Sequence, residues 1–144
     1  MEQSSISRRR RSLMQGAGAA AALGTLGFPA IVRSQSEAIR IGHLTPRTGF
    51  LGPVGEYAVM GINLAVEEIN GAGGVMGRKI ELIAEDSVNP QTASTKAERL
   101  IERDKVSAII GEISSASGLA IAQVAQRNRT LFFNTGCNSD DLRG

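Results

Sequence analysis

The chain has 144 residues, the length of one modest domain, and a formal net charge of +2. Its single cysteine, Cys137, excludes an intramolecular disulfide, and no histidine and cysteine cluster has the spacing of a metal site. Stability must therefore come from an apolar core, and we expect neither a metal nor a cofactor.

Residues 1–36 are typical of an export signal peptide. Arginines at 8–11 precede an apolar stretch at 16–28, and small residues follow it. The stretch is shorter than the roughly 20 residues that span a bilayer, so we expect cleavage, after Ser34 or Ser36, rather than a permanent anchor. Residues 10–14 resemble a twin-arginine signal; general export and a basic arm for nucleic acid are the alternatives.

Removal of this segment changes the charge of the protein. Residues 37–144 carry 11 basic and 13 acidic side chains, a formal charge of −2. The basic character belongs to the signal, and it gives no argument for nucleic-acid binding.

From Ile39 onward, short β-branched runs alternate with segments of helical period, a pattern that predicts an open parallel sheet flanked by helices. The first expected strand is 39–44. A turn-rich loop with Phe50 follows, and then a helix over 55–69 whose buried stripe comprises Ala58, Ile62, Ala65 and Ile69.

The second expected strand is 79–85, and Asn89 is expected to cap a helix that has Pro90 at its first position and ends near Arg103. The third strand, 106–110, is mostly apolar and does not alternate, as expected for a strand whose two faces are both covered. A loop over 111–118 leads to a third helix, and a fourth strand, 131–133, precedes a polar loop over 134–141.

Two loops stand out as ligand-binding candidates, because ligands of open parallel sheets bind beyond the carboxyl ends of the strands. In the first, Ser114, Ser115 and Ser117 precede a helix N-terminus, where free amides and the helix dipole favour an anion such as a carboxylate. We expect one of these serines to cap the helix and the others to be available to a ligand. The second loop, 135–139, offers small side chains and backbone groups, with an ordinary turn as the alternative.

The sequence lacks the motifs of common α/β enzymes. The glycines at 71–74 do not complete a dinucleotide fingerprint, and they join a helix to a strand. No nucleophile elbow or phosphate-binding loop is present, and the only histidine, His43, lies inside an expected strand. Cys137 has no evident activating histidine. We therefore expect a protein that is not an enzyme.

The ordered series of segments in residues 37–144 resembles the type I periplasmic binding proteins of the leucine/isoleucine/valine-binding family. The segments that carry the resemblance are 39–42, 48–49, 65–70, 73–82, 86–93, 109–117 and 134–142. The resemblance implies two α/β lobes that close on a ligand. Residues 37–144 would then be most of the first, N-terminal ligand-binding lobe, without the second.

The resemblance also implies site residues. In relatives that bind amino acids, the two loops hold the ligand's charged backbone groups, at positions that fall here on Ser115, Ser117, Cys137, Asn138 and Ser139. Cys137 stands where relatives commonly have alanine. Val54 occupies a place that is aromatic in some members, and Phe50 precedes it, so the side-chain specificity is expected to differ.

The hypothesis is a periplasmic substrate-binding component of an ABC importer, for amino acids or related small amides, ureas or carboxylates. Its implied partners are the ligand and the membrane permease subunits, and we expect a monomer at full length that binds no nucleic acid. The alternatives are a ligand-sensing domain of the same fold in a receptor or regulator, and an exported α/β enzyme.

Overall fold

The computed structural model describes residues 37–143, which form an open parallel sheet with helices on both faces. The expected export signal, 1–36, lies outside the described residues. The strands are β1 (Ile39–Thr45), β2 (Ile80–Asp86), β3 (Ala108–Gly111) and β4 (Leu131–Asn134). The helices are α2 (Gly52–Gly71), α3 (Pro90–Glu102) and α4 (Ser115–Arg127), and a short 3-10 helix, η1 (Asp140–Leu142), follows β4.

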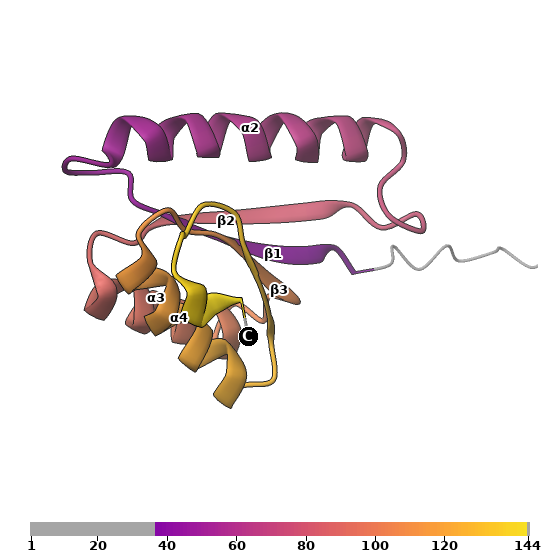
Figure 1. Ribbon diagram of the computed structural model, residues 1–144. Coiled ribbons are helices and arrows are strands. Elements are labelled where there is room, and N and C mark those ends of the chain that lie inside the picture. The colour runs from indigo at the N-terminus through magenta and orange to yellow at the C-terminus, as the bar shows by residue number, and fades with distance from the viewer. Residues whose placement is uncertain (1–36, 144) are drawn as a thin grey trace, which may run out of the picture. The chain divides into compact units, whose positions relative to one another are not determined.

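The four strands are parallel in the order β2-β1-β3-β4. The chain therefore winds from β1 to β2 on one side and returns past β1 to β3 on the other. Since such crossovers are right-handed, the reversal places α2 on one face of the sheet and α3 with α4 on the opposite face (Figure 1). The predicted fold class is confirmed.

The main core lies between the sheet and the α3–α4 face. Its fully buried members come from β1, α3, β3 and α4, and they include Leu44, Leu100, Ile109, Ile121 and Val124. The apolar run of β3 was expected to be buried on both faces, and Ala108 and Ile109 are buried.

The start of α3 follows the predicted capping. The side chain of Asn89 accepts a hydrogen bond from the amide of Thr92 at 2.9 Å, and Pro90 is the first helical residue. Both features satisfy or remove amides that have no helical acceptor, which confirms this boundary.

The buried stripe predicted for α2 is wrong in its second half. Ala58 and Ile62 are half-buried, but Ala65 is exposed and Ile69 is 39% exposed. The stripe continues instead through Val66 to Asn70, whose side chain pairs with both the amide and the carbonyl of Ile80 at 2.7 and 2.8 Å. The face of α2 toward β2 therefore ends with a polar residue, Asn70. A pattern of apolar residues cannot predict this position.

The N-terminus of α2 approaches the loop after β1 closely at Gly55. A Cβ on Gly55 would lie 1.7 Å from the carbonyl oxygen of Pro46, whereas nothing lies within 4 Å of one on Gly61 in the same helix. The start of α2 can therefore approach Pro46 this closely only because residue 55 has no side chain.

Gly55→Ala is expected to destabilise the protein by about 2 kcal/mol or more, because the helix start must move away from Pro46. Gly61→Ala, the matched control, should instead stabilise it by about 0.5–1 kcal/mol through helix propensity. Urea unfolding of both variants measures the two effects. Equal effects at the two positions would contradict the close approach.

Candidate functional site

A hollow of about 360 Å³ lies beyond the carboxyl ends of β1, β2 and β3. This is the place where the order of winding reverses, and in open α/β sheets it is where ligands bind. The loop after β1 contributes Pro46, Thr48, Gly49, Phe50 and Leu51; the segment after β2 contributes Ser87, Val88, Asn89 and Pro90; the third contributor, the start of α4, supplies Ser114 and Ser117.

The turn from β3 into α4 is organised by a buried carboxylate. Gly111 and Glu112 have positive φ angles of 135° and 74°, and the Glu112 side chain is fully buried. Its Oε1 accepts hydrogen bonds from the amides of Ile113 and Ser114, both at 3.0 Å. Hydrogen bonds to a charged acceptor are stronger than neutral ones, which offsets part of the cost of burying the carboxylate.

The predicted serine cap of α4 is wrong. Ser114 occupies the N-cap position, but its side chain makes no capping hydrogen bond, and the helix begins at Ser115 within the expected loop. Glu112 takes the amides that precede the helix. Glu112 lies two residues before the N-cap position and has a positive φ. Its role cannot be recognised from the sequence as a run of serines can.

The N-terminus of α4, which lies beside the hollow, has free amides. The first helical hydrogen bond runs from the amide of Gly118 to the carbonyl of Ser114, so the amides of Ser115, Ala116 and Ser117 have no acceptor within the helix. Ser114 and Ser117 line the hollow beside them. This arrangement suits an anionic group, since the helix dipole adds to the amide donors.

The predicted site residues divide between the hollow and the neighbouring loop. Ser117 and Phe50 line the hollow; Ser117 is buried, and Phe50 is 97% exposed. Ser115 Oγ instead accepts a hydrogen bond from the amide of Asn138 at 3.1 Å, which joins α4 to the loop after β4. Ser139, in the same loop, occupies the N-cap position just before η1.

Cys137 is buried against α4. Its thiol lies 3.4 Å from the carbonyl oxygen of Ser114, and a Cβ on Gly118 would lie 2.5 Å from its sulfur. Burial, with a smaller contribution from the negative charge of Glu112, raises the pKa of Cys137 to about 11. The thiol is therefore protonated at neutral pH, which does not suit a nucleophile.

His43 lies within β1, as predicted, and is buried. Its Nδ1 is 3.0 Å from the carbonyl oxygen of Ile110. Burial lowers the pKa of His43, and although the contact with Ile110 opposes this shift, the charge of Arg47 adds to it. The imidazole is thus uncharged at neutral pH and held in the sheet, and His43 is not among the residues that line the hollow.

Asp86, which the sequence analysis missed, joins two walls of the hollow. Its carboxylate accepts hydrogen bonds from the amide of Arg47 at 2.9 Å, the hydroxyl of Thr48 at 2.8 Å and the amide of Val88 at 3.0 Å. Burial would raise the pKa of Asp86, but these hydrogen bonds and the charge of Lys96 outweigh it and lower the pKa below its ordinary value. The ionised carboxylate therefore holds the loop after β1 against the segment after β2.

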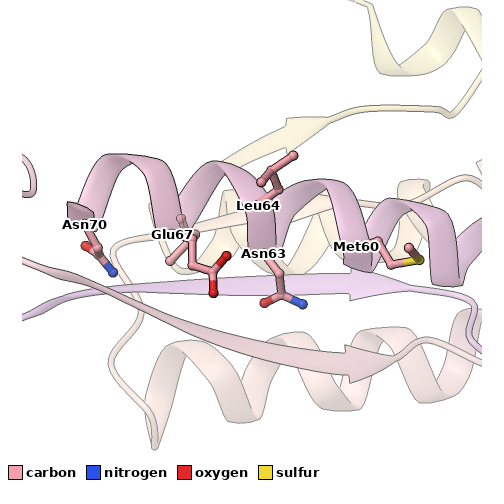
Figure 2. Close-up of a pocket in the computed structure, with 6 residues that line it drawn as sticks. Met60, Asn63, Leu64, Glu67 and Asn70 are labelled. Carbon is pink, nitrogen blue, oxygen red and sulfur yellow. The ribbon is translucent and has the colours of Figure 1, made fainter. Parts of the chain in front are cut away.

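A second hollow, of about 530 Å³, runs along α2, and Figure 2 shows Asn63, Glu67 and Asn70 extending from the helix on the side of the strands. Its lining comes from one helix, and Asn70 is already paired with Ile80. It has neither converging loops nor a helix N-terminus, so the hollow at the strand ends is the better candidate.

Within residues 37–143, no group of three or more histidine, cysteine, aspartate or glutamate side chains could hold a metal ion. No helix in the same range is both long and apolar enough to cross a membrane.

Comparisons with known proteins define the family. The sequence model of the periplasmic binding protein family matches residues 38–144. The Leu/Ile/Val-binding protein homolog 8 of Brucella suis biovar 1 (strain 1330) is 35% identical over 136 residues, which cover 94% of this chain and 33% of that protein. The chain therefore belongs to the periplasmic binding protein family, and the predicted family is confirmed.

Solved structures agree with this assignment. The branched-chain amino acid transporter substrate-binding protein LivJ of Streptococcus pneumoniae, in complex with isoleucine, has a TM-score of 0.70 and 30% identity over 73% of this chain and 30% of that one. An ABC transporter substrate-binding protein from Sphaerobacter thermophilus has a TM-score of 0.66 and 36% identity, over 73% of this chain and 28% of that one. The chain thus spans about a third of the length of the relatives that it matches.

Asp86→Asn tests the contact between the loops through its pH dependence. Since the folded pKa lies below the unfolded value of about 3.9, the stabilisation is present above that value and is lost as pH falls through the folded pKa. The variant should be less stable than the unaltered protein at pH 6–7, and the difference should shrink below about pH 4.

Urea unfolding between pH 3 and pH 7 measures this difference. Asp140→Asn serves as the control, because the Asp140 side chain is 95% exposed and its ion pair with Arg143 should contribute little. A stability difference for Asp86→Asn that stays constant down to pH 3 would show that the charge of Asp86 does not hold the loops.

Proposed function

We propose that this chain is the N-terminal ligand-binding lobe of a substrate-binding component of an ABC importer, one that captures amino acids or related small amides, ureas or carboxylates. The observation that carries the proposal is the hollow where the free amides of α4, with Ser114 and Ser117, meet the loops after β1 and β2. The polar end suits a carboxylate, while Leu51, Val88 and other apolar side chains suit the remainder of a small metabolite.

The names of the similar proteins support this proposal. The LivJ structure holds isoleucine, and the Brucella relatives are named as homologues of leucine-, isoleucine- and valine-binding proteins. The ligand partner and the permease subunits are proposed on that basis. A monomer at full length is a further part of the proposal.

The proposed location is the periplasm, with residues 1–36 as the export signal and residues 37–144 as the partial lobe. The arginines and the short apolar stretch of the first segment support export. The proposed role is not enzymatic, which agrees with a protonated Cys137 thiol and a buried, uncharged His43.

One lobe provides too little binding energy by itself. Micromolar affinity requires about 8 kcal/mol, while each hydrogen bond to a charged group contributes roughly 1.5–3 kcal/mol. Two or three such bonds at the start of α4 contribute about 3–9 kcal/mol, and association costs about 4–15 kcal/mol in lost translational and rotational freedom, so they fall short while the hollow stays open to water. A second lobe that closes over the hollow would supply the remainder, and closure would signal the loaded state to the permease.

Calorimetric titration of the protein, expressed from its own gene and recovered from the periplasmic fraction, tests the proposal. The panel comprises L-leucine, L-isoleucine, L-valine, acetamide, urea and benzoate, and at least one should bind with micromolar affinity. Ser117→Ala should weaken that binding by roughly 10- to 100-fold, the equivalent of one hydrogen bond to a charged group.

Ser107→Ala is the matched control, because Ser107 is exposed and precedes β3 at the end of the strand away from the hollow. It should bind as the unaltered protein does. Absence of the protein from the periplasmic fraction, or of binding across the panel, would contradict the proposal.

A further inference from the structure

A buried serine that the sequence analysis did not single out lies in the wall of the hollow. Ser87 directly follows β2, is 1% exposed and lines the hollow, and its Oγ has no hydrogen-bond partner. Its backbone is fixed, because its amide donates to the carbonyl of Thr45 at 3.0 Å and its carbonyl accepts from the amide of Asn89. The backbone of Ser87 is therefore held in place, while its hydroxyl has no partner among the described residues.

An unpaired buried hydroxyl is costly in a folded protein. Leaving such a group unsatisfied costs about 1–3 kcal/mol, and most buried polar groups are paired. Within residues 37–143, the other buried side-chain atoms without a partner belong to His43, Thr45, Arg99 and Glu112, and none of these residues lines the hollow. Ser87 alone combines an unpaired buried donor with a place in the candidate site.

We propose that Ser87 is a specificity-determining residue whose hydroxyl donates a hydrogen bond to the bound ligand. This inference rests on the proposed function. Ser87 follows β2, whereas Ser114, Ser117 and the free amides belong to the start of α4, so the hollow presents donors from two loops. A carboxylate has two oxygens and can accept from both sides at once.

The ligand class follows from this arrangement and from the neighbouring side chains. Leu51, Val88 and Pro90 line the same hollow and provide an apolar surface. The geometry favours a small carboxylic acid with an apolar remainder. A neutral molecule without an acceptor for Ser87 would leave the hydroxyl unpaired and should bind more weakly.

Thr45 provides a matched control within the same fold. Its hydroxyl is also buried and unpaired, but it lies 3.3 Å from the position of a Cβ on Gly55, at the start of α2, and Thr45 does not line the hollow. Thr45→Val therefore removes an equivalent hydroxyl outside the site.

The experiment compares Ser87→Ala and Thr45→Val in the protein expressed from its own gene, by calorimetric titration with L-leucine and benzoate and by thermal unfolding. Neither variant should be less stable by more than a few degrees, since each removes an unpaired group. Ser87→Ala should bind the carboxylate probes about 10-fold more weakly or worse, and Thr45→Val should bind within twofold of the unaltered protein.

Ser87→Cys keeps an unbranched side chain but replaces the hydroxyl with a larger thiol that is a weak donor, so it should also lose at least fivefold in affinity if Ser87→Ala does not fold well enough to titrate. If the unaltered protein binds and these Ser87 variants bind equally well, the role of Ser87 is overturned while the proposed function stands. If the unaltered protein binds neither these probes nor the rest of the panel, the proposed function fails, and the inference fails with it.

Discussion

The parallel pairing of β1 with a neighbour on each side is the interaction on which the rest of this structure depends. Residues 39–45 pair with β2, and residues 41–44 also pair with β3. Because the crossovers are right-handed, this central position sends α2 to one face and α3 with α4 to the other (Figure 1). The loops after β1 and β3 consequently leave the sheet in different directions, and the hollow lies where they separate.

Two carboxylates, the half-buried Asp86 and the fully buried Glu112, then organise the loops around that hollow. Asp86 bridges the loop after β1 and the segment after β2, while Glu112 takes the amides of Ile113 and Ser114 just before α4. Neither carboxylate lines the hollow itself. The first amides of α4 therefore stay available, and the polar end of the hollow keeps a net preference for an anion.

The fold was largely predictable from the sequence, but the polar contacts of the site were not. Alternation of short β-branched runs with helical segments predicts the sheet, and the Asn89-Pro90 pair marks the start of α3, since both signals are local. Ser117 and Phe50, two of the predicted ligand-binding residues, line the hollow because the start of α4 and the loop after β1 lie at strand ends, and their contact with a ligand stays a prediction.

The missed features depend on hydrogen bonds, which leave no periodic pattern in the sequence. Asp86 meets Arg47 and Thr48 across almost forty positions, whereas Glu112 accepts from the amides of the next two residues, at a position of positive φ. The inward face of α2 ends on Asn70, which bonds to Ile80 and gives no apolar signal. Periodicity records which side chains avoid water, and these residues are placed by hydrogen bonds instead.

The most direct measurement of the central claim is a titration of ¹⁵N-labelled protein with L-leucine, followed by the amide chemical shifts. If the hollow at the strand ends is the ligand site, the largest changes will occur at the amides of 115–117, 47–51 and 87–89. Binding that shifts only the amides of 60–70, along the second hollow on α2, would contradict the account.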